Sequence, residues 1–158
     1  MSYDSRPEVE KHVKRVQDYL LMIMNGLVER GGPHDFSKFL EPEKSAFDEV
    51  VPKLAGLTYG SEEYKANLAE MKPALEHHYA NNRHHPEHFE DGIKGMTLVD
   101  LVEMFCDWCA ATERHDDGDI GRSIEHNKNR LGYDEVLASI FANTAQEYRM
   151  GKSQLKEG

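Results

Sequence analysis

Helical periodicity is the feature that most limits what this chain can fold into. In its first periodic stretch, apolar residues recur at spacings of three and four, which places them on one face of an α-helix. Pro7 suits the first turn of this helix, and Gly31-Gly32-Pro33 ends it. Strand-like alternation is nearly absent from the sequence, so an all-α fold is predicted. The apolar face of the first helix is formed by Val9, Val13, Val16, Leu20, Ile23 and Leu27.

The whole sequence predicts a bundle of about six helices. A length of 158 residues suits a single domain over 1–158 that buries its own core, with 150–158 as a frayed tail. After the first helix, we expect a turn at 34–39, a helix over 42–54 that is interrupted or ended near Pro52, and a loop at 56–60. A helical segment should then run from Ser61 towards His85, with Pro73 as a candidate bend, and be followed by a loop at 85–95. The remaining expected elements are a helix over 97–113 with a capping box at its start, a turn at 115–119, a helix through 122–131 and a last helix over 133–150.

The charge balance restricts the possible partners. A formal net charge of −10 argues against a nucleic-acid polymer, because phosphate backbones are bound by basic surfaces. No run approaches the roughly 18 apolar residues of a membrane span, and the charged N-terminus is unlike a signal peptide, so a cytoplasmic protein without a membrane partner is expected. A small phosphorylated ligand stays compatible with this charge if metal ions and a few cations gather in one cleft.

Five histidines lie within twelve residues, and this density points to metal chemistry. His77 and His84 are seven positions apart, as are His78 and His85, which is two turns on one helix face. Neutral imidazole is a common ligand of zinc, iron, nickel and manganese. The alternative is a set of solvated or hydrogen-bonded histidines, with His88 among them.

Acidic residues suggest where further ligands lie. The helix over 97–113 is apolar nearly all round, and Asp100, Glu103 and Asp107 interrupt it on one narrow face. Buried carboxylates are costly unless they are paired or bound to a metal. A solvated stripe is the alternative for these acids. Its Cys106-x-x-Cys109 motif lies in the same apolar helix and is read as two buried small side chains rather than a redox pair.

In chain order the candidates are His12, His34-Asp35, the histidine cluster and Asp107, and this order resembles the HD-domain metal-dependent phosphohydrolases. The stretch HVKRVQDYLLMIMNGLVERGGPHDFSKF is similar to the usual opening of that superfamily, and HHPEHFEDGIKGMTLVDLVEMFCDWCAA to a segment of the HD-GYP-type phosphodiesterases. Gly92-Ile93-Lys94 replaces the G-Y-P triplet, so the resemblance does not extend to cyclic di-GMP cleavage. More closely, HDFSKF and NNRHHPEHF resemble a family of small uncharacterised proteins, many of them phage-encoded, over about residues 8–148.

The resemblance implies an HD-like fold that holds one or two divalent ions of manganese, iron, cobalt, nickel or zinc. Such ions lower the pKa of bound water and neutralise phosphate charge. The implied ligands are His34, Asp35, Asp107 and, as a fourth, His12 for a first ion, and His78 with either His84 or His85 for a second.

The resemblance also implies which side chains would meet the substrate. Asp35 and Lys38 are the candidate catalytic residues, and Lys38 is placed to contact phosphate. Arg83, Asn127 and Arg130 are further candidates for substrate binding, with plain surface exposure as the alternative for each.

The leading functional hypothesis is a metal-dependent phosphohydrolase for a nucleotide or a similar small phosphoester. A second is an all-α nucleoside triphosphate pyrophosphohydrolase, in which Glu103 and Asp107, with Glu63 and Glu70, would bind magnesium. A third is a non-catalytic module that binds a nucleotide or docks to a host protein in a phage setting, in the host cytoplasm. The apolar last helix could serve the core or a homo-oligomer interface.

Overall fold

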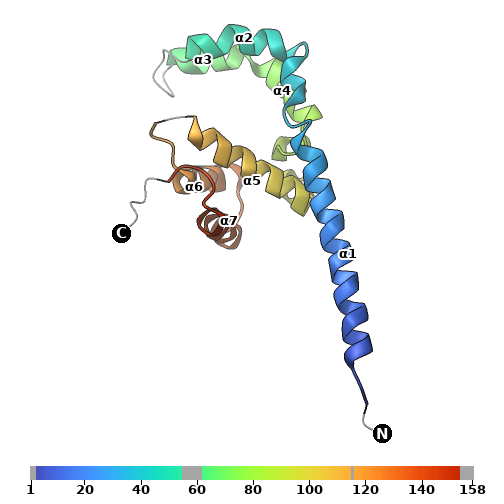
Figure 1. Cartoon of the computed structure of the whole chain (residues 1–158). Coiled ribbons are helices and arrows are strands. Elements are labelled where there is room, and N and C mark those ends of the chain that lie inside the picture. Colours follow the sequence, from blue (N-terminus) through green and yellow to red (C-terminus); the bar gives the residue numbers. More distant parts are fainter. Residues whose placement is uncertain (1–2, 55–61, 115, 154–158) are drawn as a thin grey trace. The chain divides into compact units, whose positions relative to one another are not determined.

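The computed structural model describes residues 3–54, 62–114 and 116–153. Within these ranges the chain forms seven α-helices and three short 3-10 helices, and no strand, so the all-α prediction is confirmed (Figure 1). The chain divides into two compact units, Met1–His34 and Asp35–Gly158. In the described part of the chain, no helix combines the length and the apolar character that a membrane crossing requires.

The first unit is built around α1, Arg6–Gly31. A proline stands in its first turn and Gly32 is its C-cap, so the predicted start and end of this helix are confirmed. Glu8 in the first turn and Arg30 in the last turn have the signs that complement the helix dipole. His12 and His34 belong to this unit, and their assignment as metal ligands stays a prediction.

The second unit begins with a 3-10 turn, η1 (Phe36–Phe39), followed by α2, Glu43–Leu54. Pro52 lies inside α2 without ending it, in the last turn. The helix packs against η1 and against the next two helices, α3 (Glu62–Glu70) and α4 (Lys72–Asn81). The expected loop at 56–60 and the cap at Ser61 lie outside the described residues.

The candidate bend at Pro73 is confirmed, but the predicted end of this helical segment at His85 is wrong. The segment is divided at Met71, because Pro73 lacks an amide hydrogen and is accommodated only in the first turn of a new helix, α4. This helix ends at Asn81, where Asn82 takes an extended backbone with φ −126° and its side chain donates to the His78 carbonyl at 2.8 Å. Such local side-chain bonds compete with helical hydrogen bonds. His84 and His85 therefore lie in the turn after α4 and do not share a helix face with His77 and His78.

The stretch after α4 was expected to be a loop and contains two single 3-10 turns, η2 (Pro86–His88) and η3 (Gly92–Gly95). The predicted capping box then opens α5, Leu98–Glu113. The Thr97 hydroxyl accepts from the Asp100 amide at 3.2 Å, and the Asp100 carboxylate accepts from the Thr97 amide at 2.9 Å.

The last two helices are α6 (Ile120–Leu131) and α7 (Glu135–Tyr148), each with an aspartate side chain that accepts at its N-terminus. Gly132 ends α6 with φ +70°, a left-handed conformation that favours glycine. Helix α6 packs against both α5 and α7. The core that these helices share comprises Met104, Phe105, Trp108, Cys109, Ile120, Ile124, Tyr133, Ala138, Phe141 and Ala145.

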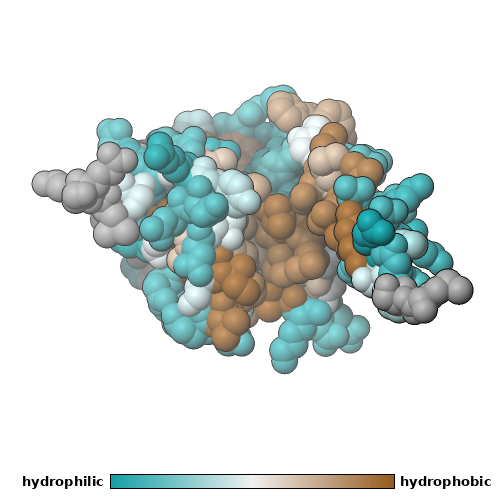
Figure 2. Space-filling model, turned by 60° about the horizontal axis from the view of Figure 1, so that its bottom comes forward, coloured by the Kyte–Doolittle hydropathy of each residue, from teal (hydrophilic) through white to brown (hydrophobic). Residues whose placement is uncertain are grey.

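The two cysteines differ in their surroundings. Cys109 is buried in this core, as expected, and burial raises the pKa of its thiol to about 12. The expectation of burial is wrong for Cys106, which is exposed because it lies on another face of α5. Apolar side chains also reach the surface of α5, at Leu98 and Val102, and of α7, at Val136 and Ile140. Figure 2 shows one face of the molecule, on which hydrophobic patches lie among hydrophilic surface.

Candidate metal centre

Four side chains of the second unit bring possible ligand atoms together. Asp35 lies at the start of η1, His78 lies in the last turns of α4, and His84 and His85 lie in the turn that follows. Each offers one nitrogen or oxygen atom, and these atoms all lie within 4.8 Å of one another. The cluster is therefore built from one helix end and two turns, and these residues could hold a metal ion.

The spacing of the atoms suits a transition-metal ion. Asp35 Oδ1 lies 3.2 Å from His78 Nε2 and 3.4 Å from His84 Nε2, and the Nε2 atoms of His78 and His85 are 2.9 Å apart. Two atoms that bind one ion at about 2.0–2.1 Å, with an angle of roughly 90–109° between them, lie about 2.9–3.4 Å apart. Three imidazole nitrogens and one carboxylate also form a ligand set that such ions prefer. The residues present fit a divalent transition metal.

The other nitrogen of two of these rings faces a carboxylate. His78 Nδ1 is 2.8 Å from Glu43 Oε2, and His84 Nδ1 is 3.3 Å from Glu103 Oε1. A carboxylate beside one imidazole nitrogen favours a proton there and leaves the opposite nitrogen as a lone-pair donor. The opposite atom, Nε2, faces the Asp35 carboxylate at 3.2 Å in His78 and 3.4 Å in His84. These distances are longer than those on the Nδ1 side, so the proton is assigned to Nδ1 and the Nε2 lone pair is left for a metal ion.

The surroundings of the cluster favour the protonation states in which its side chains can bind a metal ion. Burial alone would raise the pKa of Asp35, but contacts with His78, His84 and Lys38 outweigh it and hold this pKa well below the ordinary value. Burial, together with the neighbouring His84 and His78 rings, lowers the pKa of His85 to about 3. A charged Asp35 and a neutral His85 are the protonation states that a metal ion requires.

Asp107 adds a second carboxylate from α5. It is half-buried, and one of its oxygen atoms lies within 4.8 Å of a ligand atom of Asp35. Its charge also opposes the lowering of the His85 pKa. The second unit thus brings five of the seven sequence-predicted metal ligands together, namely Asp35, His78, His84, His85 and Asp107.

A comparison with known protein families finds a match over most of the chain. The chain matches the family described as "Family of unknown function (DUF5662)" over residues 1–148. The chain belongs to the DUF5662 family. No curated protein and no solved structure matches this DUF5662 chain.

Among the cations predicted to meet substrate, Lys38 lies nearest to the cluster. Its Nζ donates to Asp35 Oδ2 at 2.5 Å, and about a third of its side chain is exposed. Arg83 makes a bidentate ion pair with Asp100: its Nε donates to Oδ1 at 3.1 Å and its Nη2 donates to Oδ2 at 2.9 Å. Its cationic group is engaged in holding the turn before His84 to the start of α5. A structural role therefore competes with the predicted substrate role of Arg83.

The two candidates on α6 contact each other. The Arg130 Nε donates to Asn127 Oδ1 at 3.2 Å, and the Arg130 Nη1 donates to Glu87 at 2.7 Å. Asn127 is buried and its amide nitrogen donates to the Ser123 carbonyl. Arg130 keeps about 41% of its side chain exposed, so it is the more accessible of the pair.

Sequence reasoning missed Glu43, which is fully buried and contacts both His77 and His78. A lone glutamate at the start of an amphipathic helix carries no signal of burial. Glu103 was noticed as part of the acidic face of α5, without its histidine partner. His88, by contrast, is a structural histidine: its Nδ1 lies 2.9 Å from the Tyr79 carbonyl oxygen.

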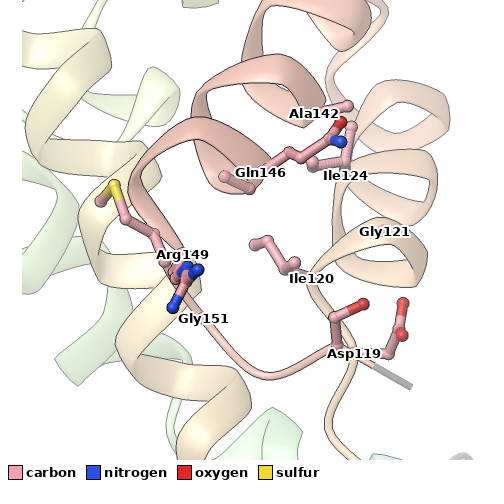
Figure 3. A pocket seen from close by; sticks show the side chains of 11 residues that line it. Asp119, Ile120, Gly121, Ile124, Ala142, Gln146, Arg149 and Gly151 are labelled. Atoms are coloured by element: carbon pink, nitrogen blue, oxygen red, sulfur yellow. The ribbon is translucent and has the colours of Figure 1, made fainter. Parts of the chain in front are cut away.

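A separate pocket of about 740 Å³ lies along α6 and α7. Figure 3 shows Ile120 and Ile124 of α6 on one side of it and Gln146 of α7 on another, with Arg149 nearby. Among the described residues that line it, none is a sequence-predicted site residue. The candidate metal centre is therefore independent of this pocket.

Proposed function

We propose that this DUF5662 protein is a metal-dependent phosphohydrolase that acts on a nucleotide or a similar small phosphoester. The observation that carries the proposal is the convergence of three imidazole nitrogens on Asp35, in a cluster whose atom spacings suit one divalent ion. His78 and His84 are buried, and a buried carboxylate with imidazole nitrogens around it is costly unless a group such as a cation compensates its charge. The resemblance to HD-domain phosphohydrolases supports the class of reaction.

The proposed cofactor is a divalent ion of manganese, iron, cobalt, nickel or zinc. His78, His84, His85 and Asp35 would hold it, and Asp107 lies close enough to take part or to help hold a second ion. The predicted contributions of His12 and His34 belong to the same proposal. A bound ion of this kind supplies a water molecule of lowered pKa and neutralises charge on a phosphoryl group.

The remaining work falls to side chains of the chain itself. Lys38 can direct its ammonium group to a phosphate oxygen, since part of it is exposed beside Asp35. Arg130 is a candidate for the outer part of the ligand, because its Nη1 donates at 2.7 Å to Glu87, which lies two residues after His85. An acidic chain needs such local cations to attract an anionic substrate.

The decisive experiment compares wild-type protein with a His78→Ala, His84→Ala double variant. We expect freshly purified wild-type protein to contain a stoichiometric transition metal by elemental analysis and to release phosphate from members of a nucleotide panel. A chelator should abolish release, and manganese, cobalt or nickel should restore it. The double variant should lose both metal and activity, whereas a His126→Ala control, which changes an exposed histidine on α6, should keep both.

Three results would contradict the proposal in different ways. Wild-type protein that neither contains nor binds any of these ions would remove its basis. Protein that binds metal and retains a nucleotide without turning it over would instead establish the binding-module hypothesis. Activity that survives the double variant with magnesium would favour the pyrophosphohydrolase.

A further inference from the structure

Glu43 is a fully buried carboxylate in the second unit, at the first position of α2. A buried charge is costly unless it is compensated by nearby groups. Its two oxygens are used differently: Oε1 lies 2.7 Å from His77 Nδ1, and Oε2 lies 2.8 Å from His78 Nδ1. Holding both oxygens fixes the carboxylate plane as well as its position.

The surrounding hydrogen bonds determine where the proton of His78 lies. Three groups converge on the Glu43 carboxylate, namely the Ser37 hydroxyl and the Nδ1 atoms of His77 and His78, and an ionised carboxylate can only accept hydrogen bonds. His78 Nδ1 lies 2.8 Å from Glu43 Oε2, whereas His78 Nε2 lies 3.2 Å from Asp35 Oδ1, so the shorter contact assigns the proton to Nδ1. The Ser37 hydroxyl donates to the same oxygen at 2.9 Å, which leaves the Ser37 oxygen as an acceptor.

Asn82 is consistent with this assignment. Its amide nitrogen lies 3.0 Å from His78 Nδ1, but its hydrogens are directed to the His78 carbonyl oxygen at 2.8 Å and to the Ser37 oxygen at 2.7 Å. It thus fixes the end of α4 and the Ser37 hydroxyl without competing for the Nδ1 proton. With hydrogen on Nδ1, that nitrogen donates to Glu43 Oε2, and the Ser37 oxygen, 3.2 Å away, is a second acceptor within reach.

We propose that Glu43 is a positioning residue of the candidate metal centre, which fixes His78 in the tautomer whose Nε2 lone pair faces Asp35 and His85. This inference rests on the metal centre of the proposed function and adds to it a residue that binds no metal itself. Replacing a residue that hydrogen-bonds to a metal ligand typically weakens metal binding by about 10- to 100-fold.

The test uses Glu43→Gln, which keeps the size of the side chain but brings an amide that can donate to Nδ1. Glu49→Gln is the matched control, since Glu49 lies on the same helix with about 69% of its side chain exposed, in an ion pair with Lys53. The first measurement is the nitrogen-15 NMR signature of the histidine rings in chelator-treated, metal-free protein. It reports directly which ring nitrogen carries the proton.

In wild-type protein and in Glu49→Gln we expect His78 to carry hydrogen on Nδ1. In Glu43→Gln we expect a mixture or the opposite tautomer at His78, with His84 unchanged. The second measurement is cobalt affinity, followed by the visible absorption of the bound ion, which we expect to weaken about 10- to 100-fold in Glu43→Gln only. A merely structural Glu43 would lower the melting temperature of the metal-free protein without changing either quantity.

Wild-type His78 with its proton on Nε2 would overturn the inference, and this measurement needs no variant to fold. Cobalt affinity in Glu43→Gln within about twofold of wild type would overturn it as well. Failure of the wild-type protein to bind any metal would refute the proposed function instead, while the tautomer measurement would still decide the role of Glu43.

Discussion

Asp100 connects the turn that carries His84 and His85 to the helix that carries Glu103 and Asp107. Its carboxylate is fully buried and accepts two hydrogen bonds from Arg83, as well as bonds from the Thr97 amide and hydroxyl. Because Arg83 directly precedes His84, loss of this carboxylate should both weaken the fold and loosen the candidate metal centre.

The cost of Asp100→Ala can be estimated from these contacts. Loss of a helix N-terminal box typically costs about 1 kcal/mol, within a range of roughly 0.5–2. Hydrogen bonds to charged groups contribute about 1.5–3 kcal/mol each when buried. Arg83 is about 42% exposed, so water recovers much of that energy when the partner is removed. We therefore expect a total loss of about 2–4 kcal/mol in the free energy of unfolding.

Asp134→Ala is the matched control, because Asp134 caps α7 with one bond to the Leu137 amide at 3.0 Å and is exposed. It should cost about 1 kcal/mol. Urea unfolding of metal-free protein, followed by circular dichroism, measures both values. If Asp100→Ala lowers the free energy of unfolding no more than Asp134→Ala does, the ion pair between Asp100 and Arg83 does not stabilise the fold. Arg83 would then be a stronger candidate for substrate binding.

Three further predictions concern protonation and access. Metal-free protein should lose stability as the pH falls from 6.5 towards 3, because His85 has the ordinary histidine pKa of 6.5 in the unfolded chain and a pKa of about 3 in the folded chain. When stability is measured by urea unfolding at each pH, a His85→Asn variant should show a flatter profile over that range. Glu103→Gln should weaken cobalt binding in a titration and shift the NMR tautomer signature of His84 rather than of His78. A thiol reagent should label Cys106 in the folded protein and reach Cys109 only after denaturation, and equal labelling rates would contradict the described core.

Local signals in the sequence predicted most of the helices. The apolar spacing of α1, the capping box of α5 and the glycine after α6 each act through neighbouring residues, so each could be read from a short stretch. The side chains that orient the histidines could not be predicted in this way. Glu43 is 35 positions before His78, and only the packing of α2 against α4 brings the two together.

The histidines lie close together although the helix that was expected to carry them ends early. On one continuous helix, neighbouring side chains point about 100° apart, so His84 and His85 could not both face one point. The helix instead ends at Asn81, and His85 takes an extended backbone, as a residue before proline must. In that turn the two rings lie side by side, with centres 4.2 Å apart, and both reach Asp35 and His78. Pro86 and Asn82, which look like simple helix-ending residues in the sequence, are therefore the residues that allow adjacent histidines to share one centre.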